Sequence, residues 1–355
     1  MQRLIALSLS IPFVASAMLA LVADDKPEDP AVAAARKRQE SIKTLDVKFK
    51  HSESYAKGAV SDASRSNPNP PVPVPAEDMS VESMNRIVID GEKIRVEDNH
   101  PGWYDRGKRT YKQSRIYTFD GDTGYLLQHG DYGERTIVQG GIEQGFLGRD
   151  WHFVPLYISV RGLCPTFSSP TMAQLQPSRT TQTIGDDLCE QYVVPTKGGA
   201  PTLFWLEAKS DYCIRRIRNG NVDQSHSVYN VQNTCDEKYG WLPKSWSHEE
   251  HSWKGKLLAT HTFEIQEMKI NEPVPADDFK IEFPSGAMVA KNRNGSHKMY
   301  IVQPDGSMQE DDLASHMPLP ARKTWYPPLT WSISAVILIV IGVLAIIVVR
   351  RGNAR

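Results

Sequence analysis

The sequence predicts a mainly β protein with a few helices: a strongly curved antiparallel half-barrel sheet of about 11 to 13 strands, covered by helices and followed by one C-terminal transmembrane helix. Three observations support this fold class. Short apolar-alternating segments separated by turn residues fill most of the chain. Eight Trp and thirteen Tyr suit half-buried pleated surfaces. One uncharged segment near the C-terminus is long enough to cross a bilayer.

The two ends of the chain indicate its location. Residues 1–23 carry a positive charge near their start at Arg3, followed by an apolar run and by small residues suited to cleavage, as in a secretory signal peptide. Residues 329–349 carry no charge, and Arg350 and Arg351 follow at once, which places the C-terminus in the cytoplasm. We therefore expect a single-pass protein of the cytoplasmic (inner) membrane with an ectodomain (24–291) in the periplasm or extracytoplasmic space, a juxtamembrane tether (292–328) and a cytoplasmic tail (350–355).

The first elements after the signal are a helix and a strand. Asp29 and Pro30 have the chemistry of a helix N-cap and first position. The apolar face expected for this helix contains Val32, Ala35, Gln39 and Ile42. The next segment, 45–50, alternates apolar and charged residues, as a strand with one wet face does. Residues 61–76 are rich in Ser, Asn and Pro and predict an extended surface loop.

A series of strands follows, with one further helix. Asp90-Gly91 and Asp120-Gly121-Asp122 are typical hairpin turns, and the second lacks the other ligands of a calcium loop. A helix is expected over 151–160, although Pro155 weakens it. The expected strands are 85–89, 92–97, 115–119, 125–129, 135–139, 179–184, 189–194, 202–208, 212–218, 225–231, 239–248 and 257–270.

Four cysteines, Cys164, Cys189, Cys213 and Cys235, suit an oxidising compartment and permit three pairings. If 212–218 and 225–231 form a hairpin, the start of the first strand lies near the end of the second. We therefore favour Cys213 with Cys235 and Cys164 with Cys189, the alternative being buried thiols.

Charge and motifs exclude several classes of function. Forty-one basic and 42 acidic side chains give a net charge of −1, so no overall field attracts nucleic acid. The sequence has no nucleophile elbow, phosphate loop or dinucleotide fingerprint, so we predict no enzyme and no cofactor. His248-Glu249-Glu250-His251 lacks the spacing that places two imidazoles on one helical face, and residues three apart on a strand point to opposite faces. We interpret it as a solvated strand edge, with no metal.

Three segments resemble the periplasmic lipoprotein-carrier superfamily, which includes the outer-membrane lipoprotein-sorting carrier and the sensor domains that regulate sigma factors. These segments are the opening helix with Leu45-Asp46-Val47-Lys48-Phe49, then Ile116-Tyr117-Thr118-Phe119-Asp120-Gly121, and then residues 275–289. The resemblance covers about residues 30–289. It implies an open half-barrel whose apolar concave face holds acyl chains under a helical lid. The carrier's Arg-Pro latch after the second strand is replaced here by Ile89-Asp90-Gly91.

The resemblance leads to one leading function and two alternatives. The leading hypothesis is a non-catalytic, membrane-anchored protein that binds a lipid or an acylated lipoprotein; a concave apolar surface in water favours an occupant. The second is a sensor or interaction module that binds a partner membrane protein, and the third is an envelope hydrolase using His248 or His251. The expected lining, which could equally form an ordinary core, is Val47, Phe49, Ile87, Ile89, Ile94, Val96, Tyr117, Phe119, Phe204, Leu206, Phe263 and Ile265.

Overall fold

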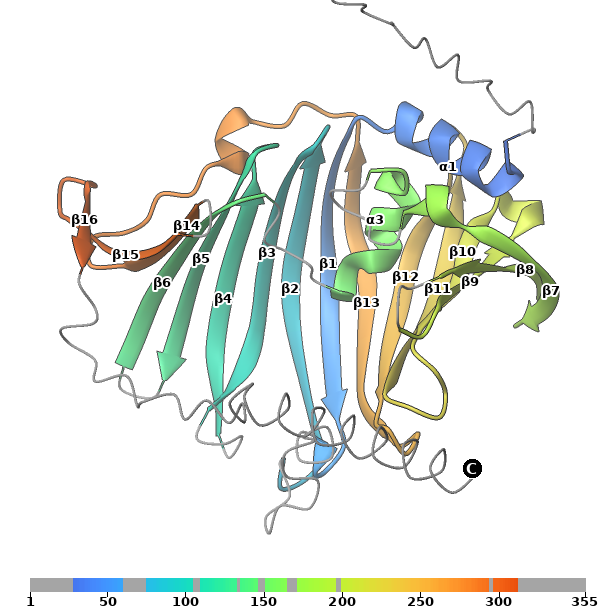
Figure 1. Ribbon diagram of the computed structural model, residues 1–355, viewed down its shortest axis with the longest axis horizontal. Helices are drawn as coiled ribbons and strands as arrows, with labels where there is room; N and C mark the ends of the chain where they lie inside the picture. The colour runs from blue at the N-terminus through green and yellow to red at the C-terminus, as the bar shows by residue number, and fades with distance from the viewer. Residues whose placement is uncertain are drawn as a thin grey trace, which may run out of the picture.

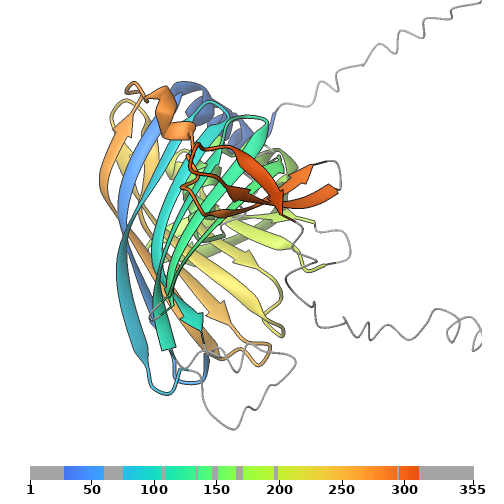
Figure 2. The ribbon, with the colours of Figure 1, turned by 90° about the vertical axis from the view of Figure 1, so that its left-hand side faces the viewer.

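The computed structural model describes residues 28–59, 75–104, 109–132, 135–145, 151–164, 171–195, 199–293 and 296–311. This part of the chain forms one open, curved sheet of sixteen strands, with α1 and α3 on its concave side (Figures 1 and 2). The mainly β fold is as predicted, with more strands than expected. The expected signal peptide, most of the Pro-rich loop and the expected transmembrane segment lie outside the described residues. Within the ranges given, no helix combines the length and apolarity needed to span a membrane.

The bounds of the elements are as follows. The helices are α1 (Pro30–Ser41) and α3 (Val154–Arg161), with the 3-10 turns η1 (Trp151–Phe153), η2 (Met172–Gln174), η3 (Ala208–Ser210) and η4 (Ala276–Phe279). The strands are β1 (Thr44–Tyr55), β2 (Met79–Asp90), β3 (Lys93–Tyr104), β4 (Arg109–Phe119), β5 (Thr123–Tyr132), β6 (Arg135–Gln144), β7 (Gln176–Ile184), β8 (Asp187–Val194), β9 (Thr202–Glu207), β10 (Cys213–Asn219), β11 (His226–Asp236), β12 (Gly240–His251), β13 (Leu257–Ile270), β14 (Met288–Arg293), β15 (Ser296–Val302) and β16 (Met308–Asp311).

The order of the strands follows from two meanders joined at the centre. Across the sheet the order is β16-β15-β14-β6-β5-β4-β3-β2-β1-β13-β12-β11-β10-β9-β8-β7. Every neighbouring pair is antiparallel except β14 with β6, which is parallel. Strand β1 thus pairs with β2 on one side and with β13 on the other. Strands β14–β16 carry the sheet through residues 288–311, part of which we expected to be tether.

Helix α1 begins where the sequence predicted. The Asp29 carboxylate accepts a hydrogen bond from the Ala31 backbone N–H at 2.9 Å, and Pro30 occupies the first turn, where its missing N–H costs nothing. Its buried face, however, is displaced by one position from the expected one and contains Ala31, Ala34, Ala35 and Arg38. Because three of these side chains are methyl groups, α1 lies close to the core while burying little apolar area per turn.

The second predicted helix is also present. Residues 151–153 form η1 and residues 154–161 form α3, with Pro155 in its first turn. Proline is tolerated there because the first helical N–H groups have no partner inside the helix. Every residue of α3 from Pro155 to Arg161 is buried, so this helix fills the concave side rather than lying on its rim.

The predicted disulfides are wrong, because Cys189, Cys213 and Cys235 are free thiols. The hairpin of β10 and β11 forms as expected, but its register places Asn233 beside Cys213, with the Asn233 amide donating to the Cys213 sulfur at 3.4 Å. Cys235 lies two residues further on and pairs with Trp241 of β12. Cys189 packs with Leu203 and Trp205, whereas Cys164 is part of the core under α3.

These thiols differ in their expected reactivity. Burial, together with the charge of Glu207, raises the pKa of Cys189 to about 11 and that of Cys213 to about 12, whereas Cys235 is exposed. Because the thiolate is the nucleophile, we expect an aromatic disulfide reagent at pH 8 to label Cys235 rapidly and Cys189 and Cys213 only after unfolding. Mass spectrometry of the labelled peptides would check this. Equal labelling rates at Cys213 and Cys235, or no labelling of Cys235, would contradict it.

Candidate functional site

The structure brings together the twelve apolar residues expected to line the concave face. Eleven of them are no more than 7% exposed and belong to one core cluster, and Ile265 packs against that cluster. Their common face is the one covered by α1 and α3, whose Ala31, Ala35, Leu156 and Ile158 are members of the same cluster. In this conformation the twelve side chains pack as a core. Their role as a ligand-binding surface stays a prediction.

An aromatic group holds the centre of this face. The ring of Phe49 on β1 lies 5.2 Å from that of Phe153 on η1, 6.0 Å from Trp246 on β12 and 6.1 Å from Phe263 on β13. The Trp246 indole N–H also donates to the His152 carbonyl at 2.8 Å. The turn that leads into α3 is therefore fixed to three central strands by ring contacts and one hydrogen bond.

Helix α3 is fastened at its other end by Arg161. Its guanidinium donates to the backbone carbonyls of Ile42 at 2.7 Å, Lys43 at 2.7 Å and Gly91 at 3.1 Å. Burial lowers the pKa of Arg161, although nearby Cys164 and Asp90 oppose this. The sequence has no arginine at the β2–β3 turn, but Arg161 of α3 donates to a carbonyl of that turn. We call these hydrogen bonds of Arg161 the latch.

Helix α1 is held more lightly. Arg38 donates to the Asp211 carbonyl at 2.6 Å and lies 3.8 Å from the Asp211 carboxylate. At the helix C-terminus, the Gln39 side chain accepts from the Leu163 N–H at 3.1 Å. A helix of twelve residues is marginal on its own in water. Because its buried face is rich in alanine, we expect α1 to separate from the rest of the fold more easily than α3 does.

Beyond the apolar rows, the same face becomes polar. His51 and Glu53 continue the inward-facing series of Phe49 on β1, and they are 3% and 4% exposed. Glu53 pairs across the strands with His261 of β13, which pairs in turn with His248 of β12. All four side chains are buried, and His152 of η1 covers them from the helical side. We call His51, Glu53, His152, His248 and His261 the histidine cluster.

The polar atoms of the histidine cluster lie close together. His51 Nε2 lies 3.4 Å from His261 Nδ1 and 3.5 Å from Glu53 Oε1, and His261 Nδ1 lies 3.6 Å from the same oxygen. His248 Nδ1 lies 3.2 Å from His152 Nδ1. Two overlapping sets could hold a metal ion, His51 with Glu53 and His261, and His152 with His248 and His261.

The protonation of the cluster is uneven. Burial lowers the pKa of His51 and of His248 to about 3, so both rings are neutral at physiological pH. Burial alone would also lower the pKa of His261, but the polar contacts and charges of Glu250 and Glu53 raise it to about 9. Contact with His261 correspondingly lowers the pKa of Glu250. Without a bound cation, His51 and His248 are therefore neutral imidazoles, and His261 is a cationic ring between two carboxylates.

The expectation of a solvated edge at His248–His251 is wrong for His248. Strand β12 is internal, between β11 and β13, and His248 is 3% exposed. The expected alternation is correct, since His251 points away and lies 3.3 Å from Glu249. Sequence reasoning missed His51, Glu53, His152 and His261. The available signal was the polar continuation of an inward-facing series, from Val47 and Phe49 to His51 and Glu53.

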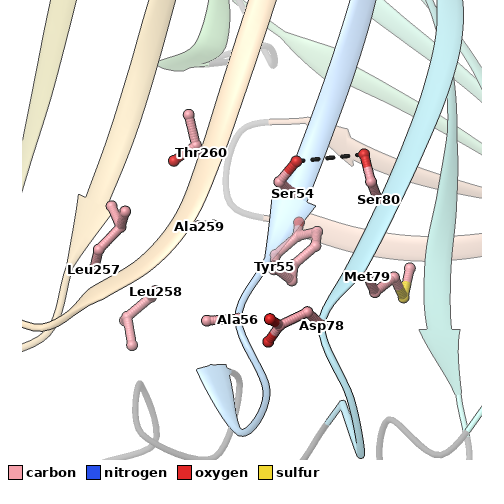
Figure 3. A pocket seen from close by; sticks show the side chains of 10 residues that line it. All are labelled: Ser54, Tyr55, Ala56, Asp78, Met79, Ser80, Leu257, Leu258, Ala259 and Thr260. Carbon is pink, nitrogen blue, oxygen red and sulfur yellow. Dashed lines mark hydrogen bonds between the residues drawn. The ribbon is translucent and has the colours of Figure 1, made fainter.

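Two pockets lie away from the histidine cluster. One, of about 350 Å³, lies where β1 ends and where β2 and β13 begin. Figure 3 shows the hydrogen bond between Ser54 and Ser80 in its lining, with Tyr55 and Asp78 nearby. The other, of about 680 Å³, contains Lys50, Ser52 and Glu264, which alternate with inward-facing residues and so lie on the outer face. Most residues that line the smaller pocket are apolar, among them Met79, Leu257 and Leu258, whereas most that line the larger pocket are polar or charged.

Comparison with known proteins finds similar folds. The structure resembles a LolA superfamily protein from Nitrosomonas europaea (11% identity, 71% of this chain and 97% of that chain, TM-score 0.40). It also resembles an outer membrane lipoprotein-sorting protein domain from Vibrio parahaemolyticus (7%, 70% and 95%, 0.31) and a conserved protein from Thermus thermophilus (10%, 74% and 100%, 0.32). No family model and no curated protein matches the sequence.

Proposed function

We propose that this chain is a non-catalytic binding protein that holds a lipid, or the acyl chains of a lipoprotein, on the concave face of its sheet beneath α1 and α3. The observation that carries the proposal is the cover of that face: a single apolar surface spanning β1–β4 and β8–β13 is closed by two short helices rather than by a second sheet. The sequence motifs that resemble the lipoprotein-carrier superfamily support the same function.

The energetics favour exchange between helix and ligand. We expect displacement of α1 to uncover part of the core cluster to which Ala31 and Ala35 belong, and each methylene of an acyl chain buried there contributes about 0.8 kcal/mol. A tail of ordinary length can therefore replace the small contacts of three alanines. Arg161 keeps α3 in place at the same time, so the aromatic centre remains formed.

The location follows the ends of the sequence and is part of the proposal. A signal at 1–23 and an anchor at 329–349 would hold the sheet at the outer side of the cytoplasmic membrane. A protein so anchored receives or presents its ligand there, rather than shuttling between membranes.

The test is photo-crosslinking of the full chain in bacterial membranes. A benzophenone side chain replaces Phe119, which is 4% exposed on the concave face, and cellular lipids carry a radioactive fatty acid. The matched control places the same group at Leu188, 57% exposed on the β7–β8 hairpin. We expect radiolabel on the chain after irradiation for Phe119 and not for Leu188. Equal labelling, or none at Phe119, would overturn the proposal; a protein adduct at Phe119 would favour a partner-binding module.

A further inference from the structure

The histidine cluster has a geometry that hydrogen bonding explains poorly. Good N–H···O bonds have heavy-atom distances of about 2.9 to 3.0 Å. Here the distance from His51 Nε2 to His261 Nδ1 is 3.4 Å, and the distances from Glu53 Oε1 to these two nitrogens are 3.5 and 3.6 Å. Three buried polar atoms are thus gathered on two adjacent strands at distances where none forms a strong bond with another. Spacing of this kind is typical of ligand atoms that share one bound cation.

A divalent transition metal satisfies this arrangement. With metal–nitrogen distances of about 2.0 to 2.1 Å, tetrahedral coordination places the ligand atoms about 3.3 to 3.4 Å apart, close to the three distances between these atoms. Two imidazoles and one carboxylate are also a donor set that zinc prefers. We propose that His51, Glu53 and His261 form a Zn²⁺-class metal site with three protein ligands, a number that leaves the fourth tetrahedral position open.

The surroundings provide the outer contacts that metal-bound histidines require. His261 presents Nδ1 to the site, and its Nε2 has no hydrogen-bond partner among the described residues but lies 3.7 Å from Glu250 Oε1. A carboxylate behind a ligating imidazole fixes its orientation and raises its basicity. His51 Nδ1 faces the Asn85 side-chain amide at 3.5 Å. The Asn85 side-chain oxygen accepts from the Asn99 backbone N–H at 2.9 Å, which fixes the amide beside the ring.

The site lies directly beneath the helical cover. His152 precedes α3, and its ring centroid lies 4.4 Å from that of His261. Its Nδ1 is 3.2 Å from His248 Nδ1, and His248 Nε2 is buried without a hydrogen-bond partner in the described part of the chain. His152 and His248 thus form a second group of imidazoles that shares His261 with the proposed site. The inference is independent of whether a lipid binds.

The test uses the full chain in mild detergent, without a polyhistidine tag and stripped with chelator. Zn²⁺ is titrated against a chromophoric chelator, and Co²⁺ absorption reports the coordination geometry. We expect one Zn²⁺ per chain, a tetrahedral Co²⁺ spectrum, and at least roughly 100-fold weaker binding in His261→Ala. The control is the double variant His226→Ala, His251→Ala, which removes a stacked imidazole pair from β11 and β12 and should bind as the unchanged chain does.

Several results would overturn the inference. These are an unchanged chain that takes up no Zn²⁺ and gives no tetrahedral Co²⁺ spectrum, or a His261→Ala variant that binds as tightly as the control. If His261→Ala does not fold, Glu53→Gln keeps the shape while removing the charge and should still weaken binding.

Discussion

Replacing Phe49 with alanine is expected to lower the free energy of unfolding by roughly 3 to 5 kcal/mol. The side chain is fully buried and touches Phe153, Trp246 and Phe263, so its removal leaves a cavity at the point where three central strands meet the helical cover. The surrounding rings are held by separate elements and can collapse into the space only in part. Urea-dependent pulse proteolysis of the full chain in mild detergent measures the change.

The matched control for this prediction is Trp253→Ala. Trp253 lies between β12 and β13 and is 49% exposed, so its loss should change the free energy by no more than about 0.5 kcal/mol. If the two variants unfold at the same urea concentration, Phe49 is not the packing centre that the geometry indicates. A loss confined to Phe49→Ala would support it.

Replacing Arg161 with methionine should cost roughly 2 to 4 kcal/mol, because the carbonyls of Ile42, Lys43 and Gly91 lose a charged donor. Methionine fills most of the volume, so the loss reports the hydrogen bonds. We also expect the substitution to accelerate amide exchange more in α3 than in β13, because the helix loses its hydrogen bonds to the sheet. Pulse proteolysis and hydrogen exchange with mass spectrometry give the two readouts.

The control for the latch is Arg36→Met on α1. Arg36 is 53% exposed and pairs with Glu28, and exposed pairs of this kind contribute little. A Arg161→Met variant as stable as Arg36→Met, with unchanged exchange in α3, would show that the helix is held by packing alone. Increased lipid labelling of Arg161→Met in the crosslinking experiment would connect the latch to ligand access.

Much of the fold could be predicted because local patterns decide it. Asp29 and Pro30 mark the start of α1, and Asp90-Gly91 marks the hairpin of β2 and β3, without any distant partner. The alternation of apolar residues such as Val47 and Phe49 with charged ones likewise indicated which face of the strand is apolar. Residues 288–311 were harder, since β14 joins β6 in parallel across a long connection and its pairing leaves no local trace.

The features that were missed depend on partners far away in the sequence. The acceptors of Arg161 lie 118, 119 and 70 positions away, and no local signal specifies them. The disulfide prediction required a register that the hairpin alone does not fix, and a shift of two residues put Asn233 where Cys235 was expected. His248 looked like part of a solvated edge because the expected strand ended at that residue, whereas β12 continues to His251 and pairs with β11 and β13 on its two sides.

The pairing of β1 with β13 has a consequence for how the chain acquires its structure. His51 and His261 are 210 positions apart, whereas the strands on either side of this seam pair mostly with their immediate neighbours in the chain. We therefore expect the two meanders to form separately and the pairing of β1 with β13 to form last. Folding is then slow, and the edges of β1 and β13 are exposed to aggregation until they pair. The histidine cluster stands on that seam, so an ion bound there would stabilise only chains that have completed the final step.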